Sequence, residues 1–193
     1  MHNNVAQEAA KAIWTHWQNN TRLDALPIDI RPATRQEGYA VQAMLPAVAS
    51  RTVLGWKIAA TSAVGQAHIN VSGPMAGRIL SGQVLQDGDE VPSLGNWMRV
   101  AEPEIAFVMQ SDLNPRAVAY SLEEVMQAVG ALHPSLEIPN SRFTVFTAVG
   151  EAQLAADNAC AHQFILGPKA PESWRDIDLS KHAVHAQVTA SNG

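Results

Sequence analysis

The sequence is poor in cysteine and has no long apolar runs. Cys160 is the only cysteine among 193 residues, so an internal disulfide is excluded and a reducing cytoplasm is the expected compartment. The apolar runs fall far short of the roughly 20 residues that span a bilayer. The N-terminus, MHNNVAQEAA, lacks the basic and apolar regions of a secretory signal. We therefore expect a cytoplasmic protein without a membrane partner.

Positive charge is also scarce. Lys and Arg number 13 against 18 Asp and Glu, which gives a formal net charge of −5, and the basic residues form no block. Binding to nucleic acid or to an anionic membrane is therefore not expected. Hydrophobic residues make up 47% of the chain and charged residues 16%. This composition supports one sizeable core and argues against disorder.

The apolar spacing predicts two helices at the N-terminal end. A stripe with a four-residue repeat predicts the first, over 4–18, and consists of Val5, Ala9, Ile13 and Trp17. Thr34 and Glu37 have the spacing of a capping box, and the apolar face behind them predicts a second helix over about 35–49. Pro27 and Pro32 break the pattern between the two helices.

Downstream, strands and helices mix without regular βαβ repeats, which predicts an α+β fold. Ser121 and Glu124 have capping-box spacing and start a predicted helix whose apolar face extends to Leu132. Asn192 and Gly193 have the chemistry of a hairpin turn. The other predictions are a buried strand over 52–60, a turn at 87–89, a strand over 98–109, a helix near 148–159, and strands over 162–167 and 182–190.

The stretch RVAEPEIAFVM at 99–109 places two glutamates on a predicted strand. Glu102 and Glu104 are two residues apart and therefore share one face of it. Pro103 cannot donate to a sheet ladder, so it suits an edge strand or a bulge. Neighbouring carboxylates repel each other unless a cation or a proton lies between them, and Mg²⁺ prefers oxygen ligands. The motif alone favours a solvated strand face over a metal site.

Two further residues strengthen the hypothesis of a charged site. Glu137, in the strand-like segment PSLEIPNSRF, would add a third carboxylate and leave about three metal positions for water or substrate. Lys57 lies within the apolar segment VLGWKIAA, where a buried lysine requires a partner or a function as acid, base or substrate anchor. The alternatives are a solvent-facing Glu137 and a Lys57 that extends to the strand edge.

Six segments occur in the following order: EGYAVQ at 37–42, GWKIAATS at 55–62, GPMAGRIL at 73–80, RVAEPEIAFVM at 99–109, LEIPNSRF at 136–143 and ADNACAHQFILG at 156–167. Together they resemble the 2-keto-4-pentenoate hydratase / 2-oxo-3-hexenedioate decarboxylase group of the fumarylacetoacetate hydrolase superfamily. The resemblance covers most of the chain from about residue 37 onward.

The resemblance implies an active site. It assigns the metal ligands to Glu102, Glu104 and Glu137. It assigns the active-site lysine to Lys57, with Mg²⁺ or Mn²⁺ as the cofactor and a small 2-oxo acid as the substrate. Ser141 and Arg142, which follow Glu137, are candidate substrate-binding residues.

The resemblance also implies an architecture. The expected fold is a mixed β-barrel or roll with flanking helices, and the expected assembly is a homo-oligomer. Residues 1–50 would form an N-terminal helical segment and residues 51–193 a fumarylacetoacetase C-terminal-like catalytic domain. Members of the group continue for several segments after the turn at Asn192 and Gly193, so the catalytic domain is expected to be incomplete.

The expected function is a metal-dependent hydratase of 2-oxo or 2-hydroxydienoic acids from aromatic catabolism. A 4-oxalocrotonate-type decarboxylase is the runner-up, because both reactions use the same metal and enolate chemistry. A C–C bond hydrolase of the superfamily would need a Glu–His pair on a lid helix, and the corresponding loop has only His68. An inactive truncated member is the remaining alternative. Asn140, where the group often has Asp, also departs from the pattern.

Overall fold

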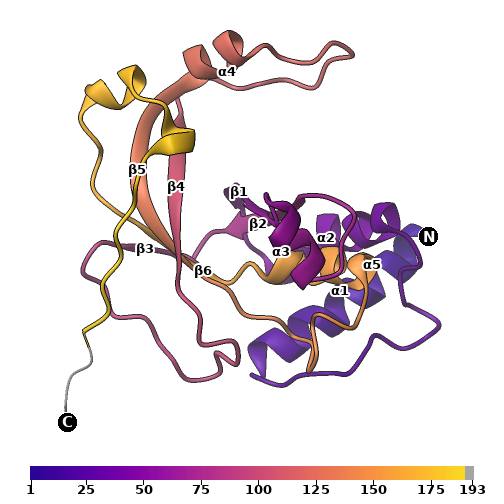
Figure 1. The fold of residues 1–193 in the computed structure, drawn as a ribbon. Helices are drawn as coiled ribbons and strands as arrows, with labels where there is room; N and C mark the ends of the chain where they lie inside the picture. The colour runs from indigo at the N-terminus through magenta and orange to yellow at the C-terminus, as the bar shows by residue number, and fades with distance from the viewer. Residues whose placement is uncertain (190–193) are drawn as a thin grey trace.

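The computed structural model describes residues 1–189, in which helices and strands are mixed along the chain (Figure 1). The helices are α1 (Asn3–Gln18), α2 (Arg35–Ala49), α3 (Ala63–His68), α4 (Leu122–Ala128) and α5 (Glu151–Ala156), with 3-10 turns η1 (Asn158–Cys160), η2 (Glu172–Asp176) and η3 (Leu179–Lys181). The strands are β1 (Val53–Ala59), β2 (Met75–Leu80), β3 (Val84–Gln86), β4 (Glu102–Met109), β5 (Val129–Ile138) and β6 (Gln163–Leu166). Within the described residues, no helix is both long and apolar enough to span a bilayer.

The helices α1, α2 and α5 form one packed body (Figure 1). Both predicted N-terminal helices are confirmed, and the Thr34 hydroxyl accepts a hydrogen bond from the Glu37 backbone N–H at the start of α2. The small side chains of α1 let the helices approach closely. The buried residues of this core are Ala6, Ala9, Ala10, Ile13, Leu26, Val41, Leu45, Phe143 and Ala156.

The strands form two open sheets. β1 pairs antiparallel with β2, and a second sheet has the order β3-β6-β5-β4. Only its β3–β6 pair is parallel. The α+β class is therefore confirmed, while the strands of residues 1–189 do not close into a barrel. A second core, of Met75, Leu154, Ala155, Ala159 and Cys160, connects β2 to α5 and η1.

The pair β4–β5 forms a long ribbon that rises away from the helical body and carries α4 at its far end (Figure 1). A third core stabilises this end. Trp174 of η2 is buried there with Val129 and Leu132 of β5, and Ile105 of β4 packs against them. The ribbon thus has its own packing, and its near end lies next to β1 and β2.

The helix predicted after Ser121 is shorter than its apolar spacing indicated. The capping box of Ser121 and Glu124 is present, but α4 ends at Ala128 and Val129 begins β5. The prediction that Val129 and Leu132 lie on this helix is wrong. Their apolar spacing fits a helix face as well as a buried strand, and the pairing of β5 with β4 decides between them.

Two predictions about strands are also wrong. β1 was expected to be buried, but Leu54, Trp56 and Ile58 are each more than half exposed, because β1 pairs only with β2 and its outer side is uncovered in the described chain. Residues 182–189 form no strand, since none of the described strands pairs with them. The predicted turn at Asn192 and Gly193 lies outside the described residues.

Candidate functional site

The register of β4 on β5 brings three glutamates together. Glu102 lies directly opposite Glu137, and Glu104, two residues further along β4, shares their face. One carboxylate oxygen from each lies within 4.8 Å of the other two. β4 is an edge strand, which explains how Pro103 is tolerated between the two β4 glutamates. The charged cluster predicted from the sequence is therefore formed by the fold.

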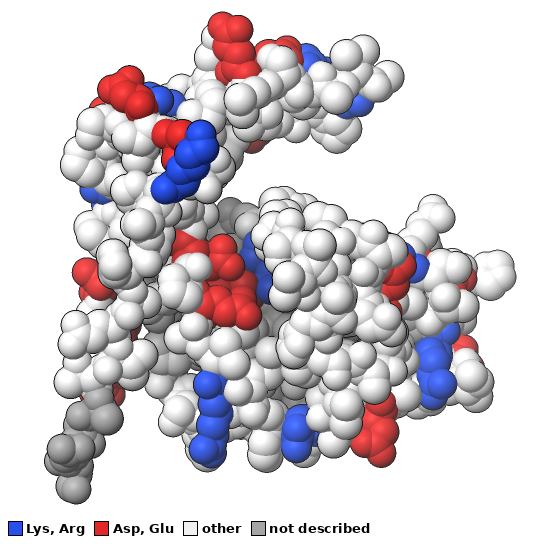
Figure 2. Space-filling view, in the orientation of Figure 1, with Lys and Arg blue, Asp and Glu red and all other residues white. Residues whose placement is uncertain are grey.

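Lys57 reaches this cluster from the other sheet. Its Nζ lies 3.0 Å from Oε1 of Glu137, and its side chain is 9% exposed. Lys57 sits on β1, so the two sheets meet at this ion pair. Figure 2 shows acidic side chains gathered in a hollow between the β4–β5 ribbon and the helical body. The ion pair gives the buried lysine the carboxylate partner that the sequence analysis required.

Burial and crowding perturb the carboxylates. Desolvation raises the pKa of Glu137 to about 7, against the attraction and hydrogen bond of Lys57. Desolvation also raises the pKa of Glu104, and repulsion from Glu102 raises it further. Perturbed carboxylates beside a cavity are typical of functional sites. A cation placed among the three oxygens would remove this repulsion.

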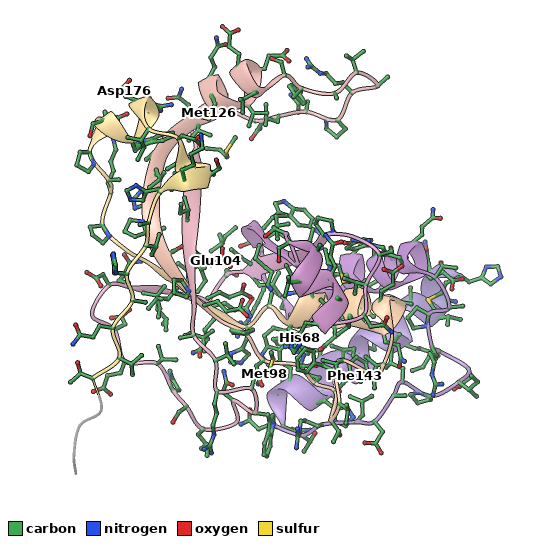
Figure 3. All side chains as sticks on the ribbon, viewed as in Figure 1. His68, Met98, Glu104, Met126, Phe143 and Asp176 are labelled. Carbon is green, nitrogen blue, oxygen red and sulfur yellow. The ribbon has the colours of Figure 1, made fainter. Side chains whose placement is uncertain are left out.

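A cavity of about 210 Å³ adjoins the cluster. Lys57, Glu102 and Glu104 supply its charged wall. His68 of α3 also lines the cavity, and it lies apart from Glu104 in the view of Figure 3. The rest of the lining is mostly apolar and includes Ile58, Ile69, Met75, Met98, Phe146 and Leu154. The cavity is small for a ligand site, so it suits a short, partly apolar acid.

Left-handed backbone forms part of the cavity wall. Asn158, Ala159 and Cys160 have φ values of 57°, 49° and 62°, and Ala60 has a φ of 55°. Ala60, Ala159 and Cys160 all line the cavity. Such φ values are unfavourable for residues with a Cβ atom, and strained backbone of this kind clusters at functional sites. The Asn158 side chain holds the turn by bonding the backbone N–H and carbonyl of Arg78.

Ser141 and Arg142 lie elsewhere. Each is 2% exposed. The Ser141 hydroxyl donates to Asp157 Oδ2 at 2.7 Å, and the Arg142 guanidinium pairs with the same carboxylate, which is fully buried. Neither residue lines the cavity. The structure thus does not bring the two candidate substrate-binding residues to the glutamate cluster.

Sequence reasoning missed the role of Asp157. Asp157 and Asn158 follow α5 and had only the signature of an ordinary helix end. In the structure Asp157 is the acceptor for Ser141 and Arg142 across a separation of about 15 residues. Asn140 ties the loop before β4 to the end of β5, since its Oδ1 accepts from the Trp97 backbone N–H and its Nδ2 donates to the Gly95 carbonyl, both at 2.9 Å.

The residues of the cluster fit a hard divalent cation. All three candidate ligands are carboxylates, which suit Mg²⁺, Mn²⁺ and Ca²⁺ better than softer metals. Their oxygens are close enough to share one ion. Burial raises the pKa of Glu104 and of Glu137, and repulsion between the glutamates adds to it against the attraction of Lys57. Cys160 is a poor nucleophile, because burial raises the pKa of its thiol to about 12.

Comparison with known proteins supports the resemblance that the motifs indicated. No family model matches the chain. The 2-keto-4-pentenoate hydratase of Paraburkholderia xenovorans (strain LB400) is 29% identical over 177 residues, which are 90% of this chain and 64% of that protein. The 2-oxo-hept-4-ene-1,7-dioate hydratase of Escherichia coli is 31% identical over 124 residues, 63% of this chain and 46% of that protein. The resemblance to the hydratase and decarboxylase group is thus confirmed.

A solved structure has the same fold. The 4-oxalocrotonate decarboxylase from Pseudomonas putida G7, complexed with magnesium and adipate, matches with a TM-score of 0.78 and 23% sequence identity. The match covers 93% of this chain and 68% of that one. The chain spans a little under two thirds of the length of the first hydratase relative, 64%.

Proposed function

We propose that the chain belongs to a metal-dependent lyase that hydrates 2-oxo or 2-hydroxydienoic acids, as the hydratase relatives are named to do. The observation that carries the proposal is the cluster of Glu102, Glu104 and Glu137 beside Lys57, next to a small cavity that Lys57, Glu102 and Glu104 help to line. An acid of this class has a polar head suited to the charged wall and a short carbon chain suited to the apolar one.

We assign the three glutamates as ligands for Mg²⁺ or Mn²⁺. The bound metal would supply Lewis-acid stabilisation of negative charge on the substrate. Lys57 is the proposed acid and base, because its ammonium group lies at the boundary between the carboxylates and the cavity. From there Lys57 can move a proton to or from a substrate carbon during tautomerisation. The apolar wall excludes water from the remainder of the substrate.

Decarboxylation is the second candidate. The fold matches a 4-oxalocrotonate decarboxylase, and the proposed ligands and proton donor would serve loss of CO₂ as well as addition of water. We do not extend the proposal to C–C bond hydrolysis, because His68 on α3 has no glutamate within its helix. The two candidate reactions differ in substrate and product, so an assay separates them.

Three broader proposals accompany this function. The two open sheets would be part of a roll of the fumarylacetoacetate hydrolase type, with residues 1–50 as a helical segment and 51–193 as the catalytic domain. The protein would self-associate through exposed apolar strands such as β1. The single, buried Cys160 suits a reducing cytoplasm.

Metal binding followed by substrate turnover tests the function. Isothermal titration with Mg²⁺ and Mn²⁺ should give one site per chain, and Glu102→Ala should weaken binding by at least about 100-fold, beyond the usual effect of an outer-shell change. The metal-loaded protein is then given 2-hydroxypenta-2,4-dienoate or 2-oxo-3-hexenedioate, and products are identified by NMR. Glu8→Ala, which removes an exposed glutamate from α1, is the matched control.

The reaction products distinguish the two candidate reactions, and metal binding tests the function as a whole. Water addition to the dienoate supports the hydratase, and release of CO₂ from the hexenedioate supports the decarboxylase. A folded protein that binds neither metal contradicts the function altogether. Equal metal affinity in the Glu102→Ala and Glu8→Ala variants would contradict the assignment of Glu102 as a metal ligand.

A further inference from the structure

A second, much smaller cavity is lined by both members of the Lys57–Glu137 ion pair. Its other walls come from β2, from the turn after β2 and from residues 161–164 around the start of β6. The space that a water-sized sphere can occupy in it is about 10 Å³, which is room for one water molecule and for no organic ligand. Of the described residues, Lys57 alone lines both this cavity and the larger one. The small cavity therefore adjoins the proposed acid and base.

Buried polar atoms without partners gather around the small cavity. Within residues 1–189, seven buried side-chain nitrogen or oxygen atoms have no hydrogen-bond partner, and four of them belong to residues that line it. One of the four, Glu137 Oε1, is 3.0 Å from Lys57 Nζ and so has an ionic partner. The other three, called the unpartnered atoms below, are Arg78 Nε, His162 Nδ1 and Gln163 Oε1. Burying a polar atom without a partner is unfavourable, so three of them at one cavity indicate a shared polar ligand.

The cavity wall around His162 is held in place by its neighbours. Gln83 is buried, its Oε1 accepts from the Leu80 backbone N–H at 2.9 Å, and its Nε2 donates to the His162 carbonyl. The His162 ring stacks on Trp17 of α1, with 5.3 Å between ring centroids. Desolvation, together with nearby arginines, lowers the pKa of His162 to about 4. The imidazole is therefore neutral at neutral pH, and its Nδ1 can accept a hydrogen bond.

A single water molecule matches the polar groups at this cavity, since it both accepts and donates and a buried water makes about three hydrogen bonds. Arg78 Nε–H is a donor. The Lys57 ammonium group can add a second donor, because it has three N–H groups and Glu137 engages one. Gln163 Oε1 and the neutral Nδ1 of His162 are acceptors. A cation here would meet two positive side chains, and an anion would meet the Gln163 oxygen.

We propose that one fixed water molecule occupies the small cavity and joins the Lys57 ammonium group to the three unpartnered atoms. Arg78, His162 and Gln163 are then positioning residues, which act on Lys57 through the water. The inference rests on the proposed function only in the role given to Lys57 as acid and base. With Glu137 on one N–H and the water on another, the ammonium group is held in one orientation at the border of the larger cavity. Supporting contacts of this kind keep a reactive group in its productive geometry.

The water itself is tested by crystallography and by relaxation in solution. A crystal structure of the full chain should show a water peak within about 3.2 Å of the unpartnered atoms. Deuteron magnetic relaxation dispersion counts long-lived waters, and it should find one fewer in the double variant His162→Phe, Gln163→Leu, which removes two of the three atoms. The control His2→Phe, Gln7→Leu makes the same replacements at exposed positions and should keep the count. Equal counts in the two double variants overturn the proposal.

Magnetic resonance of the lysine ammonium groups tests the positioning role. The chain has four lysines, so the Lys57 signal is assigned by its loss in Lys57→Met. Nitrogen relaxation should show a restricted Lys57 ammonium group in the unmodified chain and a more mobile one in His162→Phe, Gln163→Leu. Circular dichroism confirms that each variant is folded, and if the double variant does not fold, the crystal structure and single variants at His162 decide.

Two single variants at His162 separate the water from the aromatic stack. His162→Phe keeps a ring against Trp17 and removes Nδ1, whereas His162→Asn removes the ring and keeps an acceptor near the place of Nδ1. The proposal expects a mobile Lys57 ammonium group in His162→Phe and a restricted one in His162→Asn. The reverse result would assign the effect to stacking on Trp17 and overturn the role of the water.

These measurements need neither metal nor substrate, so this inference and the proposed function can fail separately. If the unmodified chain binds Mg²⁺ but has no water at this position, the inference is overturned and the function stands. If the water is present but the Lys57 ammonium group moves equally in all variants, the positioning role is overturned. A chain that has the water but binds neither Mg²⁺ nor Mn²⁺ contradicts the proposed function, and the positioning role fails with it.

Discussion

Glu137 is the most constrained of the three clustered glutamates. It is 3% exposed, it lies on β5 opposite Glu102 of β4, and it pairs with Lys57. Its burial raises the pKa of its carboxyl group to about 7, whereas an ordinary glutamate ionises near 4.3. A proton therefore competes with a metal ion for this side chain close to neutral pH.

We predict that metal affinity depends on pH through Glu137. Below its pKa of about 7 the carboxyl group is protonated and a cation must displace the proton, so affinity falls as pH falls. A single competing proton with this pKa lowers the apparent Mg²⁺ affinity by about ten-fold between pH 8 and pH 6. Calorimetric titrations at pH 6, 7 and 8 measure the change. The raised pKa of Glu104 would steepen the dependence.

Glu137→Gln provides the control for this dependence. The amide cannot ionise, so Mg²⁺ binding should be weaker at every pH and less dependent on pH. An affinity of the unmodified protein that stays constant from pH 6 to pH 8 would contradict a proton on Glu137. The comparison requires no substrate and so holds for either candidate reaction.

At the residue scale, local spacing revealed the glutamates but missed their surroundings. Two carboxylates at i and i+2 on a strand share a face whatever the fold, so Glu102 and Glu104 could be paired from the sequence. Glu137 joins them only through the register of β4 on β5, so the sequence offers it as a third carboxylate but cannot show that it lies beside the other two. Asp157 looked like a helix end, because its partners Ser141 and Arg142 approach it only in the folded chain.

At the element scale, β2 is fixed by its close approach to the left-handed turn η1. Gly77 of β2 lies opposite Lys57 of β1. A Cβ atom at Gly77 would overlap the Asn158 backbone carbonyl oxygen and lie 3.1 Å from Lys57 Cγ. The absence of a side chain at Gly77 therefore allows the turn, the strand and the lysine to pack together.

We predict that Gly77→Ala lowers the free energy of unfolding by roughly 1–3 kcal/mol, the usual effect of forcing extra atoms into a packed site. The overlapped atom is backbone, so it cannot rotate away as a flexible side chain would. Gly55→Ala on the neighbouring strand β1 is the matched control, because a Cβ there meets nothing within 4 Å. Urea denaturation followed by circular dichroism measures both variants. Equal free energies of unfolding for Gly77→Ala and Gly55→Ala would show that η1 shifts to accept the added Cβ atom without a loss of stability.

The elements themselves were predicted well where their signals were local. The apolar stripe of α1 and the caps of α2 and α4 are formed by residues close together in the sequence. These three helices begin at, or within one residue of, the predicted positions. The end of α4 could not be read locally, since Val129 and Leu132 fit both helix and strand spacing. The left-handed φ of Ala159 has no sequence signal, because alanine disfavours that conformation.

At the scale of the whole molecule, uncovered apolar strands mark the surface. Leu54, Trp56 and Ile58 alternate along β1 and are 59%, 53% and 51% exposed. Phe107 and Val108, on the edge strand β4, are also exposed. Single apolar residues are normal on a surface, but a row along an open sheet edge promotes pairing with another chain. The apolar composition of β1 predicted a buried strand, but the strand is exposed, and this exposure indicates a surface for assembly.

We predict that the chain self-associates through β1 in a concentration-dependent manner. Sedimentation equilibrium should give an average mass that rises above the 20.7 kDa of one chain as the concentration increases. The double variant Leu54→Lys, Trp56→Lys should stay nearer to 20.7 kDa, because charged side chains on an open strand disfavour pairing. Leu122→Lys, which changes an exposed leucine on α4, should associate like the unmodified chain.

The controls distinguish association through β1 from nonspecific association. If all lysine variants lower association equally, net charge rather than β1 is responsible, and the assignment of β1 fails. If the unmodified chain stays at one chain mass at every concentration, the row on β1 does not mediate assembly.

Because Ile58 continues this row and also lines the cavity next to Lys57, a second copy on β1 would lie close to the candidate site. Association should then change with ligand, and repeating the sedimentation with Mg²⁺ and 2-oxohexanedioate measures that coupling.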